Sequence, residues 1–199
     1  RYTGSVDLTF NVVPKGTAFS KVTGGDKQVT LKWKSQKNIT GYQIEYSLKK
    51  DFSGSKKVTV KKAKTLTTTI KKLKAGTVYR YKVTPYMKAA DGRVYGKSVT
   101  LKTITKPAKV KVKSVKAGSR QLKVTWKKAA CTKYQVQIAT NKKFTKGLKK
   151  YTVSSKVTSK TVKKLKKGTR YYVRVRALKT YGGKTYYGVW STYKRCIVK

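Results

Sequence analysis

The amino-acid sequence predicts an all-β chain that folds as two tandem seven-stranded β-sandwiches. Along short segments such as Leu122–Trp126 and Tyr134–Ile138, apolar and polar residues alternate. This period of two is typical of half-buried antiparallel strands. Turn residues separate the segments, for example at Asp91–Gly92 and Gly182–Gly183. The sequence has no apolar stripe with helical spacing, and many short strands joined by turns favour a two-sheet sandwich.

An internal repeat divides the 199 residues into two copies of one unit. At an offset of 92 residues, Tyr42 aligns with Tyr134, and this register is maintained over most of each copy. Before Tyr42 the offset is 93, and Trp33 aligns with Trp126. The loop that follows the tryptophan is therefore one residue shorter in the second copy. Further aligned segments are Lys71–Lys74 with Lys163–Lys166, and Gly76–Val83 with Gly168–Val175.

The charge of the chain is strongly unbalanced. It has 52 Lys and Arg residues against five Asp and Glu, for a formal net charge of +47. From Lys106 onward there are 24 Lys and 5 Arg with no Asp or Glu. Self-repulsion of this size destabilises a compact state, so a polyanionic partner is the expected compensation. Because 44 of the cations are Lys and only 8 are Arg, we expect diffuse, salt-sensitive binding.

The composition argues against an enzyme. The sequence has no His and few carboxylates, so the usual general acids, general bases and metal ligands are missing. Motifs for phosphate cradles or metal sites are absent as well. We therefore expect no catalytic residue, no metal site and no cofactor. No apolar run approaches the roughly 20 residues that a membrane span requires.

Two features of each copy point to one family. A tryptophan, Trp33 or Trp126, lies on an early strand, and the pattern Leu-x-x-Gly-Thr-x-Tyr-x-x-x-Val follows at Leu73–Val83 and again at Leu165–Val175. Each copy therefore resembles a fibronectin type III domain, which is an immunoglobulin-like sandwich of seven strands. The resemblance covers residues 15–199. It implies that the tyrosine of this pattern is a tyrosine corner, whose phenol hydrogen-bonds the preceding loop. The residues that we expect in the structural cores are Trp33, Tyr79, Trp126 and Tyr171.

The same resemblance sets the expected domain organisation. We expect two domains, at residues 15–105 and 106–199. Residues 1–14, which alternate from Val6 to Val12, resemble the trailing strand of a preceding immunoglobulin-like domain. Since the chain begins without Met, we expect a monomeric fragment of a longer protein. The lysine-rich style is similar to repeats in secreted surface proteins of Gram-positive gut bacteria, which implies an extracellular, cell-surface or cell-wall location.

The candidate polyanion-binding residues are the concentrated cations. They comprise the lysine runs that follow a predicted strand in each copy, together with two outward arginines of a later strand. Arg holds an oxoanion bidentately, whereas Lys acts as a point charge. The set is Lys71, Lys72, Lys74, Lys163, Lys164, Lys166, Lys167, Arg174 and Arg176.

An aromatic group in the second copy is a further candidate surface. Gly188–Ser191 places Trp190 at the entry to the last strand, where Gly96–Ser98 of the first copy lacks an aromatic residue. Trp190 either covers a sheet edge or joins exposed tyrosines in a platform. The possible aromatic surface comprises Tyr172, Tyr186, Tyr187 and Trp190.

The two cysteines are expected to be buried free thiols. Cys131 and Cys196 align with Ile39 and Ile104 of the first copy, which are ordinary apolar residues. In the expected sandwich they lie toward opposite ends, beyond the separation that a disulfide requires.

Three functions are consistent with these features. The first is a non-catalytic adhesion and spacer module of an extracellular surface protein, whose partner is an anionic polysaccharide, a cell-wall polymer such as teichoic acid, or a host glycan or protein. The second is an accessory module of a secreted hydrolase. The third is nucleic-acid binding, which the dispersed lysines and the fold would limit to nonspecific attachment.

Overall fold

A computed structural model describes residues 12–199 of the chain, and the regular elements of this part are all β-strands. They form two sheets for each sequence copy, which confirms the predicted pair of tandem β-sandwiches. Of the strand predicted within residues 1–14, residues 1–11 lie outside the described part of the chain. Residues 12–14 form no strand.

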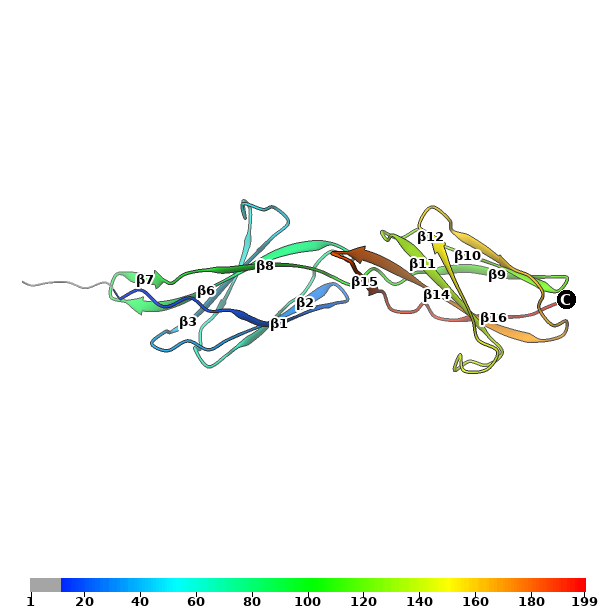
Figure 1. Cartoon of the computed structure of the whole chain (residues 1–199), viewed down its shortest axis with the longest axis horizontal. Coiled ribbons are helices and arrows are strands. Elements are labelled where there is room, and N and C mark those ends of the chain that lie inside the picture. Colours follow the sequence, from blue (N-terminus) through cyan, green and yellow to red (C-terminus); the bar gives the residue numbers. More distant parts are fainter. Residues whose placement is uncertain (1–11) are drawn as a thin grey trace, which may run out of the picture. The chain divides into compact units, whose positions relative to one another are not determined.

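The first sandwich packs a three-stranded sheet against a five-stranded sheet (Figure 1). The smaller sheet has the order β1-β2-β5. The larger has the order β4-β3-β6-β7, and β8 also pairs with β6. The strands are β1 (Phe19–Gly25), β2 (Gln28–Trp33), β3 (Gly41–Ser47), β4 (Lys56–Val60), β5 (Thr67–Ile70), β6 (Val78–Ala89), β7 (Gly92–Tyr95) and β8 (Val99–Ile104).

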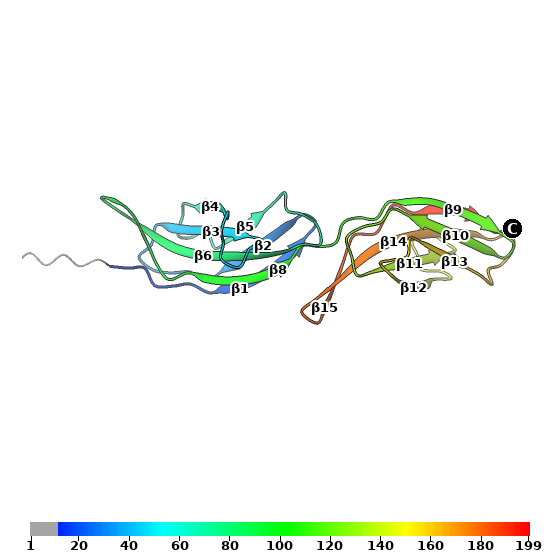
Figure 2. The ribbon, with the colours of Figure 1, turned by 90° about the horizontal axis from the view of Figure 1, so that it is seen from above.

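The second sandwich repeats this topology. One sheet has the order β9-β10-β13, and the other has the order β12-β11-β14-β15, with β16 also paired to β14. Figure 2 shows β9 and β10 on one side of this sandwich and β11 and β12 on the other. The strands are β9 (Val112–Gly118), β10 (Gln121–Trp126), β11 (Lys133–Ala139), β12 (Lys149–Ser154), β13 (Ser159–Val162), β14 (Arg170–Tyr181), β15 (Lys184–Tyr187) and β16 (Lys194–Ile197).

The last of the seven strand positions is divided into two segments in each sandwich. β7 and β8 both pair with β6, and β15 and β16 both pair with β14. The hairpin between β14 and β15 turns at Gly182 and Gly183, whose φ angles are 55° and 71°. Glycine adopts this left-handed conformation without steric cost, and two such residues suit a tight hairpin. Residues 188–193 then leave the ladder before β16 begins.

The two cores share one aromatic arrangement. Trp33 and Trp126 are 2% and 1% exposed. The ring of Trp33 meets that of Tyr42 at 5.2 Å, and the ring of Trp126 meets that of Tyr134 at 5.4 Å, both edge to face. Such pairs stabilise a core beyond the burial of their area alone. The aligned residues therefore make the same packing unit twice.

Strand β11 shows how the sequence alternation assigns the two faces of a sheet. Tyr134, Val136 and Ile138 are completely buried in the core. The intervening Gln135 and Gln137 point to the opposite face, and they lie opposite Arg176 and Arg174 of β14 in the ladder. The outer face of this strand pair is therefore polar and cationic.

Candidate ligand-binding surface

Two loops display the predicted lysine runs. We call residues 71–77, between β5 and β6, and residues 163–169, between β13 and β14, the lysine loops. All seven predicted lysines of these loops are exposed. In each loop one leucine points inward instead, and Leu73 and Leu165 are 5% and 1% exposed. Burial of the leucine fixes the loop against the sandwich and leaves its lysines in solvent.

Backbone geometry holds the two lysine loops in one conformation. Lys72 and Lys164 have φ angles of 60° and 58°, the left-handed region. The N–H of Leu73 donates to the carbonyl of Lys27, and the N–H of Leu165 donates to that of Arg120, both at 2.9 Å. The matching φ angles and hydrogen bonds mean that both loops have the same ordered backbone conformation. Each loop therefore presents its lysines at defined positions.

The tyrosine corner also supports the second lysine loop. The backbone N–H of Lys166 donates to the phenol oxygen of Tyr171 at 3.3 Å. Tyr171 is 7% exposed, and the aligned Tyr79 is buried to the same extent. The family resemblance predicts this hydrogen bond, and the structure has it in the second sandwich.

The arginines of β14 form a separate feature that we call the arginine–aromatic stack. It consists of Phe144, Arg174, Trp190, Arg176 and Tyr187. The guanidinium carbon of Arg174 lies 4.0 Å from the ring centroid of Phe144 and 4.4 Å from that of Trp190. The guanidinium carbon of Arg176 lies 4.3 Å from Trp190 and 4.2 Å from Tyr187. Rings and cations thus alternate along the outer face of the sheet, each contact being a cation–π interaction.

The glutamines of β11 fix the edges of the two guanidinium groups. Arg174 Nε donates to Gln137 Oε1 at 2.8 Å, and Arg176 Nε donates to Gln135 Oε1 at 2.9 Å. The terminal nitrogens of both arginines have no hydrogen-bond partner among residues 12–199. These nitrogens are strong donors in a fixed planar geometry, which suits an oxoanion.

The arginines are partly desolvated like charges. Burial lowers the pKa of Arg174, and the neighbouring charge of Arg176 lowers it further. Burial also lowers the pKa of Arg176, while Tyr187 opposes this change. Because a guanidinium group is a very strong base, both arginines remain charged at neutral pH. No carboxylate of residues 106–199 is available to neutralise them, because that part of the sequence has none.

At the equivalent position, the first sandwich has an ion pair in place of the arginine–aromatic stack. Lys82 occupies the position of Arg174 and forms a 2.9 Å ion pair with Glu45, which aligns with Gln137. Thr84 and Ser98 stand where Arg176 and Trp190 lie in the second sandwich, and their hydroxyls are 2.7 Å apart. The uncompensated arginine–aromatic stack is therefore confined to the second sandwich.

The four aromatic residues predicted as one surface are placed in different environments. Trp190 and Tyr187 belong to the stack, and Tyr187 is 45% exposed at its end. Tyr172 instead contacts Tyr193, with ring centroids 5.4 Å apart. Tyr186 has no ring contact within the described part of the chain. Trp190 was predicted either to cover a sheet edge or to join exposed tyrosines in a platform. In the structure its ring instead packs against the guanidinium groups of Arg174 and Arg176 on the face of a sheet.

Sequence reasoning missed Phe144 and Tyr193 as members of these aromatic contacts. Phe144 follows β11 in a turn, and its φ of 58° matches the 60° of Phe52 in the first sandwich. Their alignment at an offset of 92 was the available signal. It marked a repeated aromatic position without showing that the ring would lie over an arginine.

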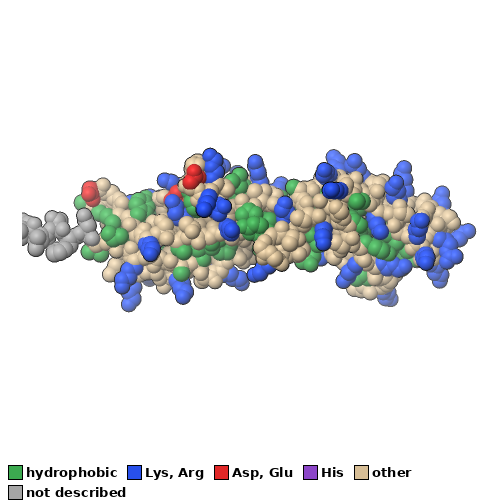
Figure 3. All heavy atoms as spheres, turned by 45° about the horizontal axis from the view of Figure 1, so that its top comes forward, with side chains coloured by type: hydrophobic (Ala, Val, Ile, Leu, Met, Phe, Trp, Pro, Cys, Tyr) green, Lys and Arg blue, Asp and Glu red, His purple; other side chains and the backbone are tan. Residues whose placement is uncertain are grey.

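Lys and Arg side chains are scattered over the visible face of both sandwiches, whereas acidic side chains appear only on the first (Figure 3). Within residues 12–199, the ion pair between Lys82 and Glu45 is the only one between side chains of opposite charge. The surface therefore carries a large positive potential that its own residues do little to neutralise.

The described residues contain no obvious reactive centre. Cys131 and Cys196 are free thiols, as predicted. They are partly exposed, however, and not fully buried as expected, because each lies at the margin of the core. Burial nevertheless raises the pKa of both thiols, which disfavours the reactive thiolate. Residues 12–199 contain no group of His, Cys, Asp or Glu arranged to hold a metal ion, and no helix among them could span a membrane.

The fold and this surface define an all-β protein built from two immunoglobulin-like sandwiches. Residues 13–101 and residues 105–191 each match the family described as Fibronectin type III domain. The chain belongs to the fibronectin type III family. Domains of this family are generally non-enzymatic and serve as adhesion, spacer or protein-interaction modules, commonly in extracellular proteins.

The solved structures to which the chain is similar include two from chicken. A two-domain fibronectin type III segment of chicken tenascin is 19% identical, with a TM-score of 0.49, over 94% of this chain and 98% of that one. The FN1–FN3 domains of chicken CNTN1 are 22% identical, with a TM-score of 0.41, over 94% of this chain. The chain spans 66% of the length of that CNTN1 segment. No curated protein matches the sequence.

Proposed function

We propose that the chain is a non-catalytic adhesion and spacer module of a secreted bacterial surface protein, which attaches through its cationic surface to anionic polymers of the cell wall or to host glycans. The observation that carries the proposal is the composition of the second domain. From Lys106 onward it has 24 Lys and 5 Arg with no carboxylate. Folding alone does not require this excess, since a balanced surface would be equally soluble and would repel itself less.

The two classes of cation have different parts in the proposed attachment. The lysine loops supply exposed ammonium groups on fixed loops, which attract phosphate, sulfate or carboxylate as point charges. Arg174 and Arg176 supply unpaired planar donors that can hold one oxoanion group bidentately. Attachment is therefore mostly diffuse, with one more structured contact on the outer face of β14.

The location proposed here is the cell wall or cell surface of a Gram-positive gut bacterium. It is supported by the resemblance of the lysine-rich repeats to secreted proteins of such organisms. Teichoic acid is a polymer of phosphodiesters, and its negative charges complement the positive charge of this surface. Host glycans with sulfate or carboxylate groups offer the same chemistry.

The test is binding of the whole chain to four polymers: wall teichoic acid, heparin, double-stranded DNA and neutral dextran. Each is measured at about 0.01 M and about 1 M salt, where the Debye length is about 30 Å and about 3 Å. We expect the three polyanions to bind at low salt and to be released at high salt, with no binding of dextran. Teichoic acid or heparin should bind at least as tightly as DNA of equal charge.

Three results would contradict the proposal. Absence of polyanion binding at low salt would leave the chain as a spacer only. Salt-insensitive binding of dextran would indicate a shaped site for a neutral sugar. A strong preference for DNA over both other polyanions would favour nucleic-acid attachment.

A further inference from the structure

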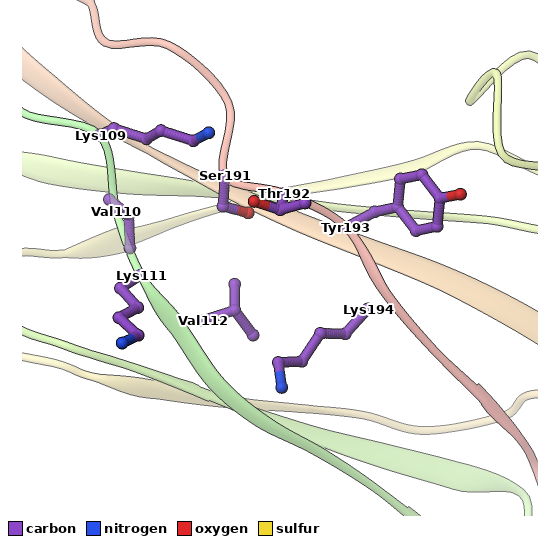
Figure 4. A pocket seen from close by; sticks show the side chains of 8 residues that line it. All are labelled: Lys109, Val110, Lys111, Val112, Ser191, Thr192, Tyr193 and Lys194. Atoms are coloured by element: carbon purple, nitrogen blue, oxygen red, sulfur yellow. The ribbon is translucent and has the colours of Figure 1, made fainter.

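A groove in the second sandwich lies apart from the lysine loops and from the arginine–aromatic stack. It encloses about 580 Å³ between residues 109–112, which lead into β9, and residues 191–194, which lead into β16 (Figure 4). β9 is an edge strand of one sheet, and β16 pairs only with β14 in the other. The groove therefore lies where both sheets present an open edge.

On each wall of the groove, one residue has backbone groups without a hydrogen-bond partner within residues 12–199. The carbonyl of Lys111 accepts from Lys127, and the N–H of Ser191 donates to Val175, so these two residues bond inward to their own sheets. In an extended strand the neighbouring residues point their N–H and C=O groups the other way. Neither Val110 nor Thr192 has a backbone hydrogen bond within residues 12–199, and we infer from this alternation that their N–H and C=O groups face away from their own sheets.

Side chains give the groove an apolar floor and a cationic rim. Val110 and Val112 form the floor and are 2% and 6% exposed. The rim carries the exposed Lys109, Lys111 and Lys194. In Figure 4, Lys111 and Lys194 extend toward one end of the groove from its two walls, and Lys109 lies at the other end. No Asp or Glu occurs after Asp91 in the sequence, so the second copy supplies no partner for these amines.

We propose that this groove binds an extended acidic peptide segment, which adds as a strand along residues 109–112 and places Asp or Glu side chains against Lys109, Lys111 and Lys194. Alternate side chains of a strand are about 6.6 Å apart, and Lys109 and Lys111 have this same two-residue spacing. The backbone of the peptide pairs with Val110, while its remaining side chains rest on the valine floor. Strand addition to an open sheet edge supplies the affinity, and the alternate carboxylates supply the selectivity.

The free backbone groups favour a peptide over an anionic polysaccharide. A polysaccharide satisfies the three amines but lacks the alternating N–H and C=O groups that an open strand edge pairs with. The proposal is independent of the diffuse attachment proposed above, because it requires a particular order of residues in the ligand as well as charge.

The test uses the whole chain and a fluorescent octapeptide in which Asp alternates with Val. A control octapeptide has the same composition with its four Asp residues in one block. A third peptide has the alternating order with N-methyl groups on its backbone amides, and polygalacturonate is the polysaccharide probe. Binding is measured by anisotropy at moderate salt for the native chain, for K109Q/K111Q/K194Q and for the matched variant K113Q/K116Q/K123Q, whose lysines are exposed on β9 and β10.

We expect the alternating peptide to bind at least tenfold more tightly than the block and N-methylated peptides. The groove variant should lose at least tenfold in affinity for it, and the matched variant less than twofold. The amide protons of Val110 and Thr192 should exchange more slowly in the complex. Thermal unfolding of both variants provides the check that they are folded.

Four outcomes would overturn the proposal. Equal losses in the two triple variants, or equal affinity for the alternating and block peptides, would mean that only net charge matters. Unchanged binding of the N-methylated peptide would exclude strand addition. Groove-dependent binding of polygalacturonate without binding of the alternating peptide would show that the ligand class is wrong.

Discussion

The guanidinium group of Arg176 lies 4.3 Å from the ring of Trp190, on the outer face of a sheet that has no carboxylate. Arg174 contacts the same ring at 4.4 Å, so one indole separates two like charges. In the first sandwich Ser98 and Thr84 replace Trp190 and Arg176 and hydrogen-bond to each other. Trp190 is thus the residue that allows the second sandwich to hold two adjacent arginines without an acid.

Replacing this indole should therefore destabilise the second domain in particular. Trp190→Ser, which introduces the first-domain residue, removes two cation–π contacts and exposes two charges that repel each other. Each contact contributes about 0.5–2 kcal/mol, so we expect a loss of about 1–4 kcal/mol in the free energy of unfolding. Urea unfolding followed by amide signals from each domain measures it.

Val189→Ser is the matched control, because Val189 is an exposed neighbour of Trp190 at 47%. Its effect should stay within about 0.5 kcal/mol. If Trp190→Ser lowered the free energy of unfolding as little as Val189→Ser, the arginine–aromatic stack would not stabilise the domain. The tolerance of two adjacent arginines would then have a cause other than Trp190.

The sequence predicted the fold well because the fold depends on repeated, local patterns. Alternation along β11 and the aligned Trp33 and Trp126 determine which faces are buried, and both copies repeat the same pattern. The division of the last strand position was not predicted. It arises because β14 continues to Tyr181 and forms its own hairpin with β15 before the chain reaches β16.

The candidate surface was only partly predictable from the sequence. The exposed lysine loops follow from a polar run around one buried leucine, which a sequence displays directly. The stack depends on Phe144 and Trp190, which are 46 positions apart in the chain, meeting the two faces of Arg174. No local pattern specifies such a meeting, because the packing of the sheet and of the turn after β11 determines it.

The lysine loop of the second domain should contribute more to polyanion binding than other lysines do. K163Q/K164Q/K166Q/K167Q removes four exposed charges from one fixed loop. We expect weaker binding to teichoic acid and a slope of log affinity against log salt that is smaller by up to about three. Titrations at several salt concentrations measure both quantities.

The control for the loop variant is K142Q/K143Q/K149Q/K150Q, which removes the same charge from exposed lysines elsewhere in the domain. Its loss of affinity should be smaller. Identical losses would mean that attachment is spread evenly over the surface and that the lysine loop has no special part in it.

Acid should weaken the first domain through Glu45. Burial by itself raises the pKa of this carboxyl, but hydrogen bonds from Lys82 and Ser55 and the charges of Lys82 and Lys57 outweigh it and leave the pKa below its ordinary value of 4.5. Because the folded-state pKa is the lower one, the stabilisation is present above the ordinary value and is lost as pH falls through the folded pKa. For a partly exposed pair we expect a loss of at most about 1 kcal/mol.

Urea unfolding at pH values from 7 down to 3 measures this loss, again with amide signals that report each domain. Glu45→Gln is the comparison variant, since the second domain already has Gln137 at this position. The variant should be less stable than the native chain at pH 7 and equal to it at the acid end. A constant difference between the two at all pH values would show that the ionisation of Glu45 has no part in stability.

Two buried tyrosines should respond to loss of the hydroxyl in opposite directions. The phenol oxygen of Tyr81 is buried without a hydrogen-bond partner in the described part of the chain, and burial strongly raises its pKa. Tyr171 Oη accepts a hydrogen bond from the N–H of Lys166. Tyr81→Phe removes an unsatisfied group and should stabilise the first domain by about 1 kcal/mol, whereas Tyr171→Phe should destabilise the second by about the same amount.

Each of these phenylalanine variants is a control for the other, because both remove one oxygen from a buried ring. Domain-resolved unfolding of the two variants gives the comparison. A destabilising Tyr81→Phe would mean that its hydroxyl is hydrogen-bonded in solution, for instance by a water molecule in the core. A neutral Tyr171→Phe would mean that the buried Leu165 holds the lysine loop in place without the tyrosine corner. In that case the conformation that presents Lys166 and Lys167 would rest on the packing of Leu165 and on its backbone hydrogen bond to Arg120.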